Sequence, residues 1–171
     1  MTASTRPEPW FRGTLAEVPA VHRAVLHALQ LAAEDLELRC NGLNAEELNA
    51  RPSGIASVAF HVRHISRSVS RLLTYAEGRQ ISGEQLAALK AEMETNAVPE
   101  VLFAELHQAL DDATRRVRAL VGCDLEAVRS VGRESLPTTL GGLLVHIAEH
   151  TQRHVGQAIT TAKLVRSDRQ H

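Results

Sequence analysis

Three histidines recur at four-residue spacing near the end of the chain. They are His146, His150 and His154, in the run HIAEHTQRHVGQ. On an α-helix, residues four apart lie on one face, offset by about 40°. Two imidazoles at positions i and i+4 of a helix can chelate one divalent metal ion. A helix pair supplies only two ligands, so this stripe predicts a metal site that another helix must complete.

A second histidine cluster lies in the run SVAFHVRHISRS and contains His61 and His64. Two ligands from residues 146–154 and one from this cluster would leave at least one coordination position open. Closed sites with four protein ligands are typical of structural zinc, so the pattern favours a reactive metal centre. The helical angles place His61 nearer the apolar face than His64. Spacing alone therefore leaves the second-helix ligand open between the two.

Other metal motifs fit the same residues less well. His146, Glu149 and His150 match the H-x-x-E-H pattern of a peptidase class, in which the glutamate is the base. Those enzymes are larger mixed α/β proteins, and no strand pattern is evident here. The HExxH form is absent, and the Glu-x-x-His pairs of di-iron bundles do not occur.

The elements that must position these residues are predicted from apolar positions at steps of three and four. Shorter helical pieces are indicated by capping-box pairs, Asn44 with Glu47 and Ser82 with Gln85. Residues 122–138 are predicted as a connection without strands. The sequence predicts an all-α four-helix bundle with an extra short helix. The expected long helices are Pro19 to about Arg39, Ser53 or Ala56 to Glu77, Pro99 to Gly122, and Thr138 or Thr139 to about Val165.

Length and composition agree with one helical domain. We expect an arm at residues 1–13, a single bundle at 14–165 and a tail at 166–171. The 171 residues are 44% hydrophobic and carry a net charge of −1. No basic run or apolar span suggests nucleic acid or a membrane as partner. Cys40 and Cys123 form no CxxC pair, so we expect reduced thiols and a cytoplasmic protein.

The last predicted helix, TTLGGLLVHIAEHTQRHVGQ, resembles that of the DinB/YfiT-like four-helix-bundle metalloproteins. That family carries HxxxH followed by one residue and then Gly-Gln. Its second helix carries a pattern like S-[IV]-x5-H-[IL]. The resemblance spans roughly residues 14–165. The matching residues here are His150, His154, Val155, Gly156 and Gln157 in the first motif, and Ser57, Val58, His64 and Ile65 in the second.

The resemblance implies which residues bind the metal. Carried over by position, it assigns His64, His150 and His154 as the ligands. His61 and His146 then become pocket-lining residues or alternative ligands. Metal-bound imidazoles need an outer hydrogen-bond partner. The sequence offers two side chains for that role, Glu149 and Gln157.

Arginines also recur at four-residue spacing, at Arg63, Arg67 and Arg71. They could form a solvated helix face. Alternatively, Arg67 or Arg71 lies near the metal pocket and binds an anionic substrate. Arg153, beside His154, could do the same.

The resemblance also implies a function. Members of the family include metal-dependent transferases and isomerases that use low-molecular-weight thiols, and hydrolase-like proteins. We therefore expect one divalent ion, zinc or nickel, and a metal-dependent thiol transferase or hydrolase acting on a small molecule. Neither cysteine looks placed as the nucleophile, which leaves metal-bound water or an external thiol. The alternative is a non-catalytic metal-binding or stress-responsive bundle. A homodimer is expected from the resemblance.

Overall fold

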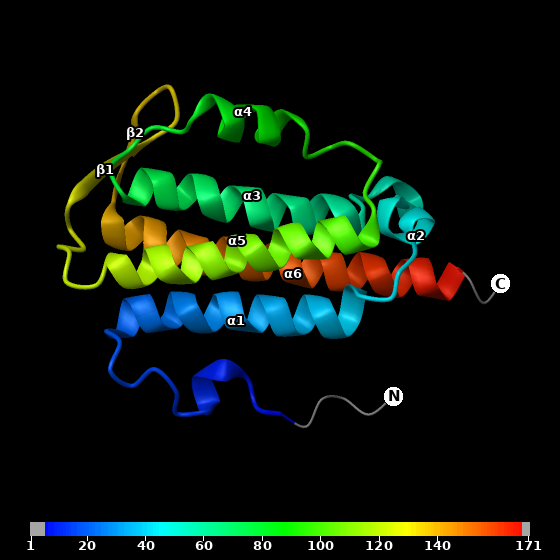
Figure 1. Ribbon diagram of the computed structural model, residues 1–171, viewed down its shortest axis with the longest axis horizontal. Coiled ribbons are helices and arrows are strands. Elements are labelled where there is room, and N and C mark those ends of the chain that lie inside the picture. The colour runs from blue at the N-terminus through cyan, green and yellow to red at the C-terminus, as the bar shows by residue number, and fades with distance from the viewer. Residues whose placement is uncertain (1–5, 169–171) are drawn as a thin grey trace.

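The computed structural model describes residues 6–168 and consists of four long helices with shorter elements between them (Figure 1). The all-α bundle expected from the sequence is confirmed. The long helices are α1 (Ala20–Cys40), α3 (Val58–Ala76), α5 (Pro99–Ala119) and α6 (Leu140–Asp168). The short ones are α2 (Ala45–Asn49) and α4 (Gly83–Lys90), with single 3-10 turns at Pro9–Phe11 and Pro52–Gly54.

The order of the long helices around the bundle is α1, α6, α3, α5. Helices α1 and α3 each pack against both α5 and α6. Figure 1 shows that α3 and α5 run in one direction, and α1 and α6 in the other. Because α3 and α5 are parallel, the chain must return along the whole bundle between them. Helix α4 lies in this crossover, on the outer side of α3 (Figure 1).

The helix starts follow the local signals in the sequence. The side chains of Asn44 and Ser82 each accept a hydrogen bond from the third backbone N–H of the helix that follows. Glu47 and Gln85 return the bond to the backbone of these cap residues, which completes two capping boxes. At the start of α6, the Thr139 hydroxyl accepts from the Gly142 N–H at 3.1 Å. These caps depend only on neighbouring residues, so the sequence predicted the first two and left the third open between Thr138 and Thr139.

The connection at residues 122–138 contains a β-hairpin that the sequence did not predict. Strands β1 (Val128–Val131) and β2 (Leu136–Thr139) pair antiparallel, with Val128 opposite Thr139. Each strand has only four residues and buries no full face, so no alternation of apolar and polar residues marks it. The hairpin leads directly into α6 and fixes its first turn. Backbone bonds join Leu140 N–H to Ala127 at 3.0 Å and Gly141 N–H to Leu125 at 2.8 Å.

The core is formed by aliphatic stripes on the four long helices. Its largest fully buried side chains include Leu29, Leu36, Ile65, Leu106 and Leu144. Leucine and isoleucine fill the interior because only 3% of residues are aromatic. Within residues 6–168, no helix is both long enough and apolar enough to cross a membrane.

The described part of the arm packs on the bundle, and the last helix extends into the expected tail. The arm packs on α1, where Pro9 is buried and the Arg12 guanidinium binds both carboxylate oxygens of Glu34 at 2.6 Å. Helix α6 continues to Asp168, three residues beyond its predicted end. Residues 1–5 of the arm and 169–171 of the tail lie outside the described residues.

Candidate metal centre

Three histidines from two adjacent antiparallel helices meet at one point of the bundle. They are His64 of α3, and His150 and His154 of α6. Each offers one ring nitrogen, and these nitrogens all lie within 4.8 Å of one another. The Nε2 atoms of His64 and His150 are 2.9 Å apart, and the ring centroids of His64 and His154 are 4.3 Å apart. The structure therefore brings together the three residues that the family resemblance implied.

The second-helix motif has a local structural reason. Ser57 caps α3 by accepting from the Phe60 N–H at 3.1 Å. Val58 and Ile65 are fully buried, so they fix the rotation of α3 against the core. His64 precedes Ile65 and is therefore held at the edge of the core, where its side chain is 17% exposed. The motif thus sets where α3 starts, how it is rotated and where its histidine lies.

Helix α6 holds its two histidines in the same way. Ile147, Thr151, Val155 and Ala158 are buried along one stripe of the helix. His150 and His154 lie beside that stripe and are half-buried. The contacts of both rings with His64 show that they point towards α3.

His61, the alternative ligand on α3, lies behind His154. Its Nδ1 is 3.0 Å from the Nδ1 of His154, and its side chain is buried. This contact leaves the Nε2 of His154 directed away from His61. The geometry groups His64 rather than His61 with the two α6 histidines.

The two residues suggested as outer hydrogen-bond partners lie elsewhere. Glu149 is bound to His146, at 2.7 Å, and to Arg153. His146 itself is 45% exposed, although its ring lies 5.1 Å from that of His150. Gln157 is exposed on α6. In the structure, Glu149 therefore partners His146 rather than His150 or His154.

A residue that the sequence did not reveal supplies the outer contact. The carboxylate of Glu92 accepts from His64 Nδ1 at 2.7 Å and from the Arg71 guanidinium at 2.6 Å. Glu92 is only 3% exposed. Burial alone would raise its pKa, but the hydrogen bonds from His64 and Arg71 outweigh burial and lower it. The ionised carboxylate can only accept, so His64 donates through Nδ1 and its Nε2 faces the cluster.

Glu92 was missed because nothing near it in the sequence marks it. It lies in the turn after α4, 28 residues beyond His64, and only the crossover brings the two together. The one sequence signal was the spacing of the α3 arginines, which includes its second partner, Arg71.

His150 and His154 are uncharged at neutral pH. Burial, reinforced by neighbouring imidazoles, lowers the pKa of His150 to about 4 and that of His154 to about 3. It lowers the pKa of His61 to about 4 as well. Phe60 adds an apolar wall, with its ring stacked on His64 at a centroid distance of 5.5 Å. Neutral imidazole is the form that binds metal.

Each of the three arginines considered for anion binding is engaged by a carboxylate. Arg67 contacts Glu105 at 2.8 Å and the carbonyl of Ala88 at 2.9 Å. Arg71 is bound to Glu92, and Arg153 to Glu149. An anionic substrate would have to compete with these pairs, which weakens the case for an anion site.

The donor set fits a divalent metal ion. Three imidazoles with converging nitrogens suit zinc, nickel, copper or iron. Both cysteines are free, and neither belongs to the group. Three protein ligands leave a position for water or substrate, as in catalytic rather than structural zinc sites.

A comparison with known families supports the same class of protein. The family model of the DinB superfamily matches residues 28–158, which is more than half of the chain. The chain belongs to the DinB superfamily. The match runs from the middle of α1 to α6 and includes all three clustered histidines. Neither a curated protein nor a solved structure matches the chain.

Proposed function

We propose that this chain binds one divalent metal ion, zinc or nickel, through His64, His150 and His154. The observation that carries the proposal is the convergence of the three ring nitrogens within 4.8 Å of one another. Three imidazoles packed this closely repel one another when protonated, and burial disfavours their charge. A metal ion bound to the nitrogen lone pairs would hold the three imidazoles together without any of them being protonated.

We further propose that the centre is catalytic and acts on a small molecule. A divalent ion with an open position lowers the pKa of bound water or thiol and polarises an electrophile. The chain's own residues hold the ligands: Glu92 orients His64, and Phe60 shields one side of its ring from water. These features support a metal-dependent thiol transferase or hydrolase.

The nucleophile would come from outside the chain. Burial raises the pKa of the Cys40 thiol to about 11, so this group stays protonated and inert at neutral pH. Cys123 is exposed and lies outside the histidine group. Water or a low-molecular-weight thiol is therefore the proposed nucleophile.

Metal binding is tested by titrating metal-free protein with zinc and nickel, and by elemental analysis of the purified chain. His150→Ala and His154→Ala should each weaken binding on the order of 100-fold or more, because losing a ligand costs at least as much as losing its outer partner. His146→Ala is the matched control, since it removes an imidazole from the same stripe of α6 but from outside the group. Equal losses in all three variants, or full metal content in the ligand variants, would refute the assignment.

Catalysis is tested separately with metal-loaded protein. A fluorescent thiol is offered with small electrophiles, and ester substrates report hydrolysis. Turnover that His150→Ala abolishes and His146→Ala retains supports the enzyme. Tight metal binding without turnover on any thiol or ester would favour the alternative, a non-catalytic metal-binding bundle. The homodimer stays a prediction, to be checked by the mass of the protein in solution.

A further inference from the structure

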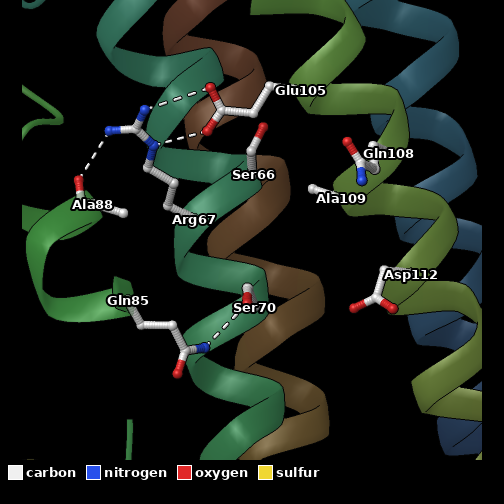
Figure 2. A pocket seen from close by; sticks show the side chains of 9 residues that line it. All are labelled: Ser66, Arg67, Ser70, Gln85, Ala88, Glu105, Gln108, Ala109 and Asp112. Carbon is white, nitrogen blue, oxygen red and sulfur yellow. Dashed lines mark hydrogen bonds and ion pairs between the residues drawn. The ribbon is translucent and has the colours of Figure 1, made fainter. Parts of the chain in front are cut away.

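The segment that carries Glu92 has little apolar attachment to the bundle. We call residues 83–96, which comprise α4 and the turn after it, the strap. No residue of α4 is buried, and the large apolar side chains Leu89 and Met93 are 38% and 55% exposed. Between α4 and α5, above α3, lies a pocket of about 300 Å³. Figure 2 shows small residues lining it, among them Ser66, Ser70 and Ala109. Hydrophobic packing therefore contributes little to holding the strap in place.

Polar bonds hold the strap instead, and most of them come from the arginines at four-residue spacing on α3. Arg63 donates to the Glu94 carbonyl and, at 2.9 Å, to the side chain of Asn96. Arg67 donates to the Ala88 carbonyl at 2.9 Å (Figure 2). Arg71 binds Glu92. These arginines form a ladder along which the strap is attached.

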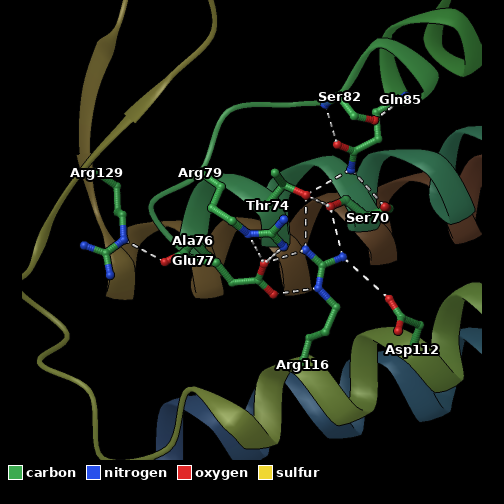
Figure 3. A network of polar contacts seen from close by, with 10 residues as sticks. All are labelled: Ser70, Thr74, Ala76, Glu77, Arg79, Ser82, Gln85, Asp112, Arg116 and Arg129. Atoms are coloured by element: carbon green, nitrogen blue, oxygen red, sulfur yellow. Dashed lines mark hydrogen bonds and ion pairs between the residues drawn. The ribbon is translucent and has the colours of Figure 1, made fainter.

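Two further bonds fix the start of the strap. Gln85 donates to Ser70 at 3.1 Å and to Thr74 at 2.9 Å. Figure 3 shows these hydroxyls beside Arg116 of α5, which itself donates to Thr74 at 3.1 Å. The strap is thus bonded to α3 from its first turn to its last residue.

Within the strap, Glu92 is the one buried residue. It is also the strap residue bound to one of the clustered histidines, through its 2.7 Å contact with His64 Nδ1. Because the strap is weakly packed, hydrogen bonds set its position. One of them joins Glu92 to His64 of the candidate metal centre. A hydrogen bond from a ligand imidazole to a carboxylate strengthens metal binding, and the coupling between two binding events is reciprocal.

We propose that Glu92 positions His64 for the metal, and that docking of the strap and metal binding stabilise each other. Docking fixes the His64 ring with Nδ1 as donor and Nε2 towards the other ligands. Metal bound at Nε2 makes the Nδ1 proton a stronger donor, which tightens its bond to Glu92 and so the strap. The inference rests on the metal site proposed above. It assigns to the arginine ladder the role of holding a segment that responds to the metal.

The coupling is tested by hydrogen exchange of the full chain, with and without zinc. In the wild type, zinc should slow exchange of the strap amides several-fold. Glu92→Gln, which keeps the side-chain shape, should weaken zinc binding about 10- to 100-fold. With saturating zinc, Glu92→Gln should also lose the zinc-dependent slowing of amide exchange in the strap. Histidine side-chain NMR of Glu92→Gln should show that the distribution of the proton between the two ring nitrogens of His64 differs from that in the wild type.

Glu105→Gln is the matched control. It removes a carboxylate from Arg67 on the same ladder, and Glu105 does not belong to the histidine group. It should bind zinc within about twofold of the wild type and keep the zinc-dependent slowing of the strap, because the ligand's outer partner is intact.

The outcomes separate this inference from the proposed function. Wild-type protein that binds no zinc refutes the metal site itself. Wild-type protein that binds zinc through His150 and His154, with strap exchange indifferent to zinc, overturns the coupling and leaves the site standing. Unchanged zinc affinity in Glu92→Gln overturns the positioning role. Circular dichroism checks that the variants fold, and the wild-type exchange comparison decides the coupling even where one does not.

Discussion

Helix α3 has two faces that are built from different interactions. Towards the core and α6 it presents Val58, Val62, Ile65 and Val69, all fully buried. Towards the strap it presents Arg63, Arg67 and Arg71, each bonded to a carbonyl or carboxylate. His64 lies between the two faces. It contacts His150 of α6 on one side and Glu92 of the strap on the other.

The core face contributes mainly stability, and the strap face contributes mainly orientation. Close-packed aliphatic side chains resist displacement, and they fix the distance between α3 and α6. Charge-assisted hydrogen bonds contribute less net stability but specify direction. One face therefore fixes the place of the histidine cluster, and the other orients one of its imidazoles, that of His64.

Acid should lower the free energy of unfolding more than a change to either face of α3. Burial lowers the pKa of His61 and His150 to about 4, and that of His154 to about 3. An unfolded histidine titrates near pH 6.5, so between about pH 6.5 and 4 the unfolded chain binds more protons. The free energy of unfolding of the metal-free protein should fall as the pH drops through this window. Several imidazoles contribute, so we expect this to exceed the effect of any single substitution below.

Urea unfolding at a series of pH values measures that slope. Replacing both His150 and His154 with glutamine should make it less steep, because two of the three imidazoles with lowered pKa values are then gone and only His61 remains. Metal-free protein that is as stable at pH 4.5 as at pH 7 would contradict the burial of these rings.

Truncation on the core face should have the next largest effect. Ile65→Ala removes a fully buried side chain beside His64 and leaves a cavity between α3 and its neighbours. We expect a loss of about 2–5 kcal/mol in the free energy of unfolding, measured by urea denaturation. A loss below about 1 kcal/mol would mean that this face is not packed as described.

Removing a charge on the strap face should have the smallest global effect. Arg67→Met keeps the aliphatic stem but loses the bonds to Glu105 and Ala88. Partly exposed ion pairs contribute about 0–1 kcal/mol, so the loss in global stability should stay within that range. Hydrogen exchange in α4 should nevertheless become faster. If Arg67→Met destabilises the protein as much as Ile65→Ala, the contrast between the two faces fails.

The same contrast explains which features could be predicted from the sequence. Apolar periodicity predicted the four helices, and the caps at Asn44, Ser82 and Thr139 depend on residues within one turn. The pairing of His150 with His154 is also local. His64 needed the resemblance to the DinB family, because helical angles alone favoured His61.

The features that were missed depend on residues distant in the chain or on very short elements. Glu92 acts through contacts with His64 and Arg71 that form only when the crossover folds back over α3. The hairpin at residues 128–139 has strands of four residues without a buried face. The expected role of Glu149 differs for a local reason, since on the exposed side of α6 its carboxylate pairs with His146 and Arg153, each within about one turn.

The position of the clustered histidines along the chain has a mechanical consequence for an ion bound there. His64 and His150 are separated by 86 residues, and the segment between them contains most of α3, the strap, α5 and the hairpin. An ion bound to both would act as a reversible cross-link that closes this loop. By loop-entropy arguments, a covalent link of that span restricts the unfolded chain by about 4–5 kcal/mol. The metal would then also act as a cross-link that stabilises this half of the fold by restricting the unfolded chain.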